Sequence, residues 1–325
     1  MKPPRRQFLH LAAGVAALPA VSRIARAQTY PTRPVRLVVT YAAGGPNDII
    51  ARLMGQWLTE HLGQPFVVEN RPGAAGNIGT EAVVRAPADG YTILLASTNN
   101  AINAALYEKL NFNFIRDIAP VATISRSMFV MVVHPSIPAK TVPEFIAYSK
   151  ANPGKINMAS SGIGSTSHVF GELFKMMTGV DTAHVPYRGA APAMTDLLAG
   201  QVQVYFVPTP GLIEYIKSGR LRALGVTTAT RWEALPDLPA IGEFVSGYEA
   251  TGWWGIGLPK NTPTEVINKL NKEINVALAD PKLTARLAEL GGTVLALSPA
   301  QFGKLIADTT ETWGKVVKFA GMKPE

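Results

Sequence analysis

The chain has 325 residues, with 31 Lys and Arg, 23 Asp and Glu, no Cys and a formal net charge of +8. Its length predicts about two domains, and a hydrophobic share of 47% with only 17% charged residues excludes a disordered protein. The lack of Cys excludes a disulfide framework, a Cys-ligated metal site and a thiol nucleophile, and we expect no lipid anchor.

Residues 1–27 have the composition of an export signal. A basic start and an apolar run over 9–18 precede Ala25-Arg-Ala27, a small-x-small cleavage site. Arg5-Arg6 is typical of a twin-arginine signal, and a Sec signal that carries two arginines is the alternative. Five of the 31 basic residues and no acidic residue lie here, which leaves 26 against 23, or +3, in the rest. We therefore expect a soluble periplasmic protein after cleavage near Ala27, and no nucleic-acid partner.

The rest of the chain alternates short apolar runs with helical patterns. The apolar runs predict strands at 35–40, 66–69, 91–96, 156–160, 202–206, 221–226 and 253–258. The periodic segments predict helices at 48–61, 77–85, 141–150, 165–178, 191–199, 212–218, 264–279, 281–290 and 299–319. This alternation predicts an α/β fold with mainly parallel sheets. Because no linker divides the chain, we expect two lobes joined by crossing strands.

Two glycine-rich segments each stand between a predicted strand and a predicted helix. The first is Tyr41-Ala-Ala-Gly-Gly-Pro-Asn-Asp48, in which Asn47 or Asp48 can cap the helix, and the second is Ser160-Ser-Gly-Ile-Gly-Ser-Thr-Ser-His168. Ligands of open α/β sheets bind beyond the carboxyl ends of strands, and the N–H groups of a helix start bind anions. One such half-site in each lobe predicts a carboxylate clamped between them. For the first loop, a tight strand–helix turn without a ligand is the alternative.

Other kinds of site find little support in the residues. There is no P-loop and no G-x-S-x-G elbow, and Gly162-x-Gly164 lacks the third glycine of a dinucleotide fingerprint. The histidines have no metal-binding spacing, so we expect neither a metal nor a cofactor.

Two further segments have a packing role as their favoured interpretation, and a third follows the end of a predicted strand. Gly73–Gly79 predicts close helix–sheet packing, with a contact of Asn77 to the ligand as the alternative. Trp253-Trp254 predicts a core strand near the junction of the lobes. Tyr187 is a candidate wall of the site, and Arg188 is expected on the surface unless it supplies charge.

Several segments form one pattern along the chain after residue 27: Tyr41–Arg52, Glu69–Gly79, Ala86–Leu95, Asp117–Val121, Gly164–His168, Val185–Gly189, Leu235–Pro239 and Gly252–Gly255. In this order and spacing they resemble the substrate-binding receptors of tripartite tricarboxylate transporters, the Bug family of periplasmic proteins. Thr40 stands where many members have Pro, and Asn113 where many have Asp.

The resemblance implies a two-lobed periplasmic binding protein of type II that closes like a flytrap. Lobe 1 is expected to comprise 28–125 and 251–325, and lobe 2 to comprise 126–250. The resemblance also implies a small organic acid held by backbone N–H groups, and a monomeric receptor that delivers it to the subunits of a membrane permease.

Carried over by position, the expected ligand contacts are Tyr41, Ala43, Gly44, Gly45, Asn47, Gly162, Gly164, Ser165, Thr166, Ser167 and Tyr187. Asp48 and His168 are expected to support the loops rather than to touch the acid. A ligand sensor for a membrane signalling partner is one alternative function. An exported hydrolase is another, although the sequence offers no recognisable base and nucleophile.

Overall fold

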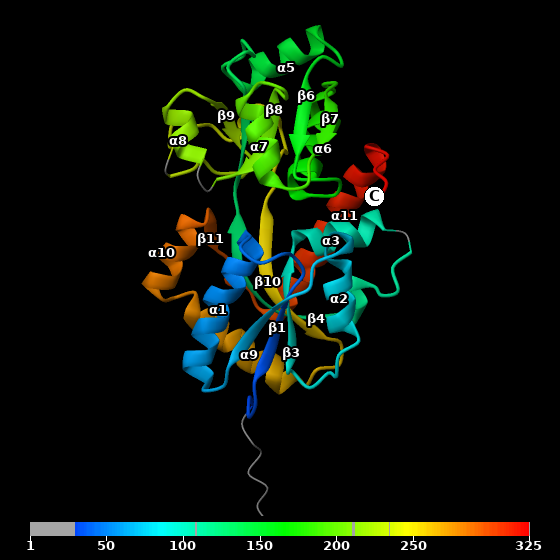
Figure 1. The fold of residues 1–325 in the computed structure, drawn as a ribbon, viewed down its shortest axis with the longest axis vertical. Coiled ribbons are helices and arrows are strands. Elements are labelled where there is room, and N and C mark those ends of the chain that lie inside the picture. Colours follow the sequence, from blue (N-terminus) through cyan, green and yellow to red (C-terminus); the bar gives the residue numbers. More distant parts are fainter. Residues whose placement is uncertain (1–29, 108, 210–211, 234, 325) are drawn as a thin grey trace, which may run out of the picture.

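The computed structural model describes residues 30–107, 109–209, 212–233 and 235–324, so the expected export signal at 1–27 lies outside it. Within these residues two sheets, each with its own helices, form the two ends of an elongated α/β molecule (Figure 1). The expected two-lobed α/β architecture is confirmed. In the described part of the chain, no helix combines the length and apolar character that crossing a membrane requires.

The first sheet has the strand order β11-β4-β10-β3-β1-β2. Its strands are β1 (Val35–Val39), β2 (Phe66–Asn70), β3 (Thr92–Ser97), β4 (Ile118–Ser127), β10 (Gly252–Pro259) and β11 (Gly292–Val294). The associated helices are α1 (Pro46–Leu62), α2 (Asn77–Val84), α3 (Thr98–Leu106), α4 (Phe114–Asp117), α9 (Thr264–Ala277), α10 (Pro281–Glu289) and α11 (Pro299–Phe319), with a short 3-10 turn η1 (Ala74–Gly76).

The second sheet has the strand order β7-β6-β8-β5-β9. Its strands are β5 (Phe129–Val133), β6 (Asn157–Ser160), β7 (Ala183–Pro186), β8 (Val204–Pro208) and β9 (Arg222–Val226). The associated helices are α5 (Val142–Ala151), α6 (Thr166–Thr178), α7 (Ala190–Leu198) and α8 (Leu212–Lys217), with the 3-10 turn η2 (Ile241–Glu243) near β9.

Helices cover both faces of the first sheet, and strand β1, which lies between β3 and β2, shows why. Successive side chains of a strand point to opposite faces. Leu37 and Val39 join one buried cluster with α1 and α9, whereas Val38 joins another with α2 and α11. A strand that is buried on both faces has a continuous apolar sequence, as Leu37–Val39 does, whereas Arg36 near the start of the strand is exposed.

The expectation of mainly parallel sheets is wrong. β1 pairs in parallel with β2 and β3, and β6 with β7 and β8. However, β10 is antiparallel to β3 and β4, β11 is antiparallel to β4, and β5 is antiparallel to β8 and β9. These antiparallel pairings all involve β4, β10 or β5, three of the strands through which the chain passes between the sheets.

Two segments of the chain, which lie side by side, connect the two sheets. Met128 alone separates β4 from β5, and residues 227–251 lead back from β9 to β10. The segments are paired where they cross: the N–H of Thr227 donates to the carbonyl of Phe129 at 2.9 Å, and Gly252 is in register with Ser127. The expected crossing strands are therefore present.

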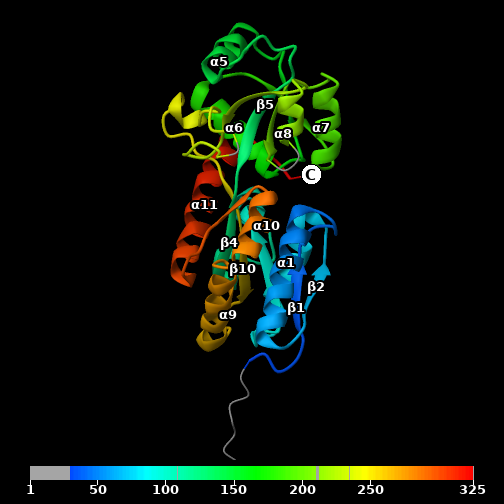
Figure 2. The ribbon, with the colours of Figure 1, turned by 90° about the vertical axis from the view of Figure 1, so that its left-hand side faces the viewer.

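Helix α11 is a further connection between the sheets (Figure 2). Near its start, Phe302 packs so closely on β10 that a Cβ at Gly255 would lie 2.5 Å from its ring. Near its end, Trp313 stacks on Phe170 of α6 with ring centroids 5.1 Å apart, and Val316 lies in the same core cluster. One continuous helix thus contributes to the core at both ends of the molecule.

Candidate functional site

The first predicted loop connects β1 with α1. Helix α1 begins at Pro46 with Gly45 in the N-cap position, and neither Asn47 nor Asp48 occupies that position. Gly44 has a left-handed backbone with φ +85°, which favours glycine, whereas Gly45 has φ −83°. The turn therefore requires glycine at Gly44 but not at Gly45.

The Asp48 carboxylate braces this loop. Its Oδ2 accepts hydrogen bonds from the N–H of Gly44 at 2.9 Å and from Arg52 Nε at 3.0 Å, and its Oδ1 accepts from Asn70 Nδ2 at 3.0 Å. The Arg52 guanidinium is the main cause that lowers the pKa of Asp48 to about 2. Asp48 is therefore an anion at neutral pH, and the N–H of Gly44 is already bonded.

The second predicted loop connects β6 with α6 and repeats this arrangement. Ser165 is the N-cap residue, and Gly164 before it has φ +75°. The N–H of Gly164 donates to Nδ1 of His168 at 3.2 Å. In both loops a left-handed glycine precedes the N-cap, and the side chain of the third helical residue accepts the N–H of that glycine.

The serine hydroxyls of the second loop bond within the loop itself. Ser165 Oγ donates to the carbonyl of Gly162 at 2.7 Å, and Ser167 Oγ accepts the N–H of Ser161 at 2.9 Å. Thr166 differs: it is half-buried, and its hydroxyl has no hydrogen-bond partner within the described ranges. Its N–H is at the first helical position, where a helix offers no internal acceptor. Among the described residues, Thr166 is thus the hydroxyl residue of this loop whose N–H and hydroxyl are free to donate hydrogen bonds.

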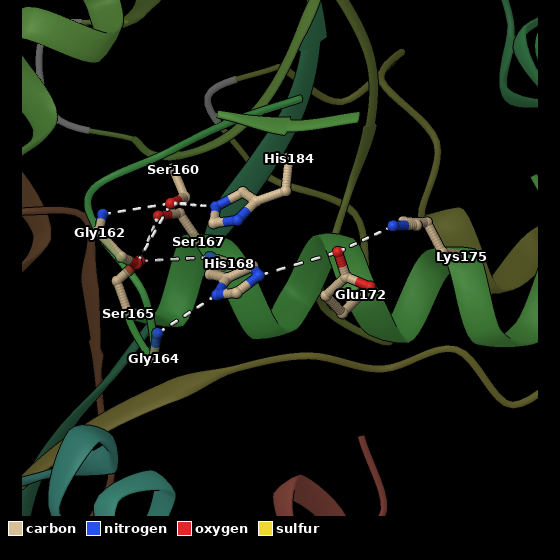
Figure 3. Close-up of polar contacts among 9 residues, drawn as sticks. All are labelled: Ser160, Gly162, Gly164, Ser165, Ser167, His168, Glu172, Lys175 and His184. Atoms are coloured by element: carbon tan, nitrogen blue, oxygen red, sulfur yellow. Dashed lines mark hydrogen bonds and ion pairs between the residues drawn. The ribbon is translucent and has the colours of Figure 1, made fainter. Parts of the chain in front are cut away.

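Two stacked imidazoles lie behind the second loop (Figure 3). The rings of His168 and His184 have centroids 3.6 Å apart and planes 8° apart. His184 Nε2 lies 2.6 Å from Ser160 Oγ, which in turn lies 3.2 Å from both the nitrogen and the oxygen of Gly162. Burial is the main cause that lowers the pKa of His168 to about 3 and that of His184 to about 4. Both rings are therefore neutral at pH 7.

Helix α3 links the two loops, although the sequence did not predict it. At its first turn, Asn99 Nδ2 donates to the Tyr41 hydroxyl at 2.5 Å, while its last residue, Leu106, lies against Gly164, where a Cβ would be 2.6 Å from Leu106 Cδ2. At roughly 1.5 Å per residue, the seven steps between Asn99 and Leu106 span about 10 Å. The helix therefore contacts both loops, at two points about 10 Å apart along its axis.

Asparagines of α3 and of the neighbouring α2 form a hydrogen-bonded group next to the Tyr41 side chain. The Tyr41 hydroxyl lies 3.3 Å from the carbonyl of Ala75, which also accepts Asn103 Nδ2 at 2.7 Å. Asn103 Nδ2 further lies 3.2 Å from Asn77 Oδ1. Asn77 Nδ2 is buried and has no partner among the described residues. Asn99 and Asn103 were not singled out from the sequence. The signal for a helix start here was Ser97-Thr-Asn-Asn100, which follows a buried strand.

The crossing strand β10 also holds the first loop. Trp254 Nε1 donates to Asn47 Oδ1, so the oxygen of this predicted ligand contact is already engaged. Trp253 is buried, with its ring edge-on to Phe302 at 5.2 Å, which confirms the expected core packing at the junction. Ala43 is exposed, and its N–H has no partner in the described part of the chain.

Tyr187 lies next to the second loop. Its N–H donates to the carbonyl of Ser160 at 3.0 Å, and its carbonyl oxygen would be 3.3 Å from a Cβ at Gly162. Its hydroxyl donates to Asp196 at 2.7 Å, and burial followed by this carboxylate raises its pKa to about 12. The neighbouring Arg188 is exposed.

The glycines at the start of α2 allow close packing, as predicted. A Cβ at Gly79 would lie 2.8 Å from the carbonyl of Arg71, and a Cβ at Gly76 would lie 2.9 Å from Thr40 Oγ1. Thr40 is almost fully buried at this contact. Thr40 therefore packs against the start of α2.

A Ser–His contact resembles part of a hydrolase site. Ser160 and His184 have the distance of a nucleophile and its base, but Ser160 is 0% exposed and its hydroxyl also contacts Gly162. Such a hydroxyl is not accessible to a substrate. Within the described ranges, no group of three or more His, Asp or Glu residues could hold a metal ion.

Comparisons with known proteins agree on one family. The family described as "Tripartite tricarboxylate transporter family receptor" matches residues 50–322. Protein BugT of Bordetella pertussis is 36% identical over 302 residues, which cover 91% of this chain and 92% of that protein.

Solved structures give the same result for the fold. R. palustris Rpa4515 with adipate has 38% identity and a TM-score of 0.81, covering 91% of this chain and all of that one. Periplasmic binding protein BugD has 36% identity, a TM-score of 0.77 and the same coverage. MatC from Rhodopseudomonas palustris with bound malate has 29% identity and a TM-score of 0.76, covering 89% of this chain and all of that one. These matches confirm the periplasmic binding protein fold, and the chain belongs to the receptor family of tripartite tricarboxylate transporters.

Proposed function

We propose that this protein is a periplasmic receptor that captures a small organic carboxylate between its two glycine-rich loops and delivers it to the membrane subunits of a tripartite tricarboxylate-type transporter. The observation that carries the proposal is the likeness, over about nine-tenths of the chain, to receptor structures that hold adipate and malate. Both are small dicarboxylates, so a dicarboxylate is the first ligand class to test.

The contacts to the acid come from the atoms that the loops leave free. The N–H of Ala43 and the side-chain amide nitrogen of Asn47 serve the first loop, and the N–H and hydroxyl of Thr166 serve the second. Gly44 and Gly164 shape the loops, since their N–H groups are bonded to Asp48 and His168. Hydrogen bonds from these donors to a carboxylate are charge-assisted and each contributes about 1.5–3 kcal/mol.

The remaining assignments follow from this role. The first sheet and its helices correspond to a lobe of residues 28–125 and 251–325, and the second sheet to a lobe of residues 126–250. Residues 1–27 act as the export signal, and the mature protein works as a monomer in the periplasm. Binding at the loops of both lobes favours the closed state, which the permease then recognises.

A thermal-shift screen against mono-, di- and tricarboxylates, followed by calorimetry, tests the function. A ligand at about 100 times its Kd stabilises the folded protein by about 2.7 kcal/mol, which a shift in melting temperature reports. We expect at least one dicarboxylate, with adipate and malate as the first candidates, to bind with micromolar or better affinity. If no acid in the screen binds, the proposed function is wrong.

The variant Thr166→Val tests the site, because it removes the hydroxyl and keeps the shape. Losing one charge-assisted hydrogen bond should weaken binding of the acid by roughly tenfold or more. Thr195→Val is the matched control, since Thr195 lies on α7 and its hydroxyl bonds, among the described residues, only the carbonyl of Ala191 in the same helix. Equal affinity of both variants would exclude Thr166 as a ligand contact.

A further inference from the structure

The two stacked imidazoles reach the second loop through different ring nitrogens. His168 on α6 uses Nδ1, which accepts the N–H of Gly164 at 3.2 Å. His184 on β7 uses Nε2, which lies 2.6 Å from Ser160 Oγ. Ser160 in turn contacts both the nitrogen and the oxygen of Gly162 at 3.2 Å (Figure 3). The pair therefore holds the loop at two glycines, one directly and one through a serine.

We infer that His168 and His184 are positioning residues, which together fix the Gly162–Ser165 loop in the conformation that binds the ligand. Neither ring is required to touch the acid. The inference rests on the proposed function, because it assigns these side chains to the same site. The inference adds to the proposed function that a specific nitrogen of each ring, and not merely the volume of the ring, sets the loop geometry.

The surroundings keep His168 in the form that this role needs. Its Nδ1 accepts a hydrogen bond, so a neutral ring carries its proton on Nε2. Nε2 faces Glu172 Oε1 at 3.8 Å, and Lys175 Nζ holds the same oxygen at 3.0 Å. Burial, followed by the neighbouring His184 and Lys175, lowers the pKa of His168 to about 3. The acceptor on Nδ1 is therefore available throughout the neutral range.

The different nitrogens allow a reciprocal test. Asn places an amide atom where a histidine has Nδ1, whereas Gln places one where a histidine has Nε2. His168→Asn should therefore preserve the bond to Gly164, and His168→Gln should lose it. At the other position His184→Gln should preserve the contact with Ser160, and His184→Asn should lose it. A role in packing alone predicts that the larger Gln is the better substitute at both positions.

The four variants and the wild-type protein are compared by amide hydrogen exchange and by calorimetry with adipate and malate. We expect amide exchange at Gly164 to be about tenfold faster in His168→Gln than in His168→Asn, with a similar ratio in affinity, as for one lost buried hydrogen bond. For His184 the order of the variants is reversed, and the affected amide is that of Gly162. Melting temperatures identify any variant that does not fold. If the variants of one histidine do not fold, the comparison of Asn with Gln at the other histidine tests the inference.

Two results would overturn the inference. One is equal exchange and equal affinity for Asn and Gln at each folded position. The other is an advantage of Gln at both positions, which would indicate a packing role. If the wild-type protein binds neither acid, that result counts against the proposed function and not against the positioning role of the two histidines. The exchange rates at Gly162 and Gly164 need no ligand, and they still decide whether the pair positions the loop.

Discussion

Asp48→Asn should weaken both the fold and the binding of the acid, because Asp48 joins the first loop to Arg52 and Asn70. An amide in place of the carboxylate turns one acceptor atom into a donor. That donor then faces the N–H groups of Gly44, Arg52 or Asn70, which themselves donate to Asp48. The loop therefore loses at least one bond, and Gly44 is less firmly held.

The size of the effect follows from the pKa of the carboxyl group. Folding lowers it from 3.8 to about 2. At about 1.36 kcal/mol per pKa unit this corresponds to about 2 kcal/mol, and screening around Arg52, whose side chain is 55% exposed, reduces it to roughly 1–2 kcal/mol. A group whose pKa is lowered by folding stabilises above its unfolded pKa. The contribution is thus complete at neutral pH and disappears as the pH falls from about 4 through about 2.

Urea denaturation of the wild-type protein and of Asp48→Asn, at neutral pH and at pH 3, measures this difference. We expect the gap in unfolding free energy to shrink to roughly half at pH 3. Asp117→Asn is the matched control, because Arg116 likewise lowers the pKa of Asp117 to about 2, but on α4 and away from both loops. Both variants should lose stability, and only Asp48→Asn should lose affinity for the acid. Unchanged affinity in Asp48→Asn, or a gap that does not vary with pH, would refute the reasoning.

Three further outcomes are expected. Gly164→Ala places a Cβ 2.6 Å from Leu106 Cδ2 and should weaken acid binding in calorimetry; the second change Leu106→Ala should restore part of the affinity. Gly44→Ala forces a side chain into a backbone with φ +85° and should cost about 1 kcal/mol in urea denaturation, whereas Gly45→Ala should cost less than half of that. Acidification from pH 6.5 towards pH 4 should lower the free energy of unfolding. In the folded protein His168 and His184 have pKa values of about 3 and 4, so over this range the unfolded chain takes up protons at these histidines and the folded protein takes up fewer. This pH dependence should flatten when Asn replaces His168 and Gln replaces His184.

Elements with a clear period could be predicted from the sequence, and those that break local rules could not. The range 299–319 was predicted for the final helix and is the range of α11. The range 118–133 was missed, and β4 contains Pro120, a residue that rarely lies inside a strand. The structure accommodates Pro120 at a register shift, opposite Gly257 of β10. Helix α3 was missed because its first turn consists of residues with low helix propensity, Thr98-Asn-Asn100.

The two glycine-rich loops could be predicted, but the hydrogen bonding of their atoms could not. Glycines and hydroxyl residues after two strands were enough to indicate both loops. Whether a given hydroxyl is free depends on its rotamer and on distant neighbours. Ser167 bonds the N–H of Ser161 six residues earlier, and Asn47 receives a bond from Trp254, 207 residues away. Such pairings exist only in the folded chain.

The two loops reach the same backbone geometry with different side chains, and their charges explain why both suit an anion. A helix start carries a partial positive charge that attracts anions. Asp48 brings a negative charge to the first helix start, but Arg52 lies one turn further on the same helix and neutralises it. His168 is the corresponding residue of the second loop, and it accepts the glycine N–H as a neutral ring. Neither brace therefore leaves a net negative charge at its helix start, and a carboxylate placed between the loops meets two unopposed helix starts rather than a repelling carboxylate.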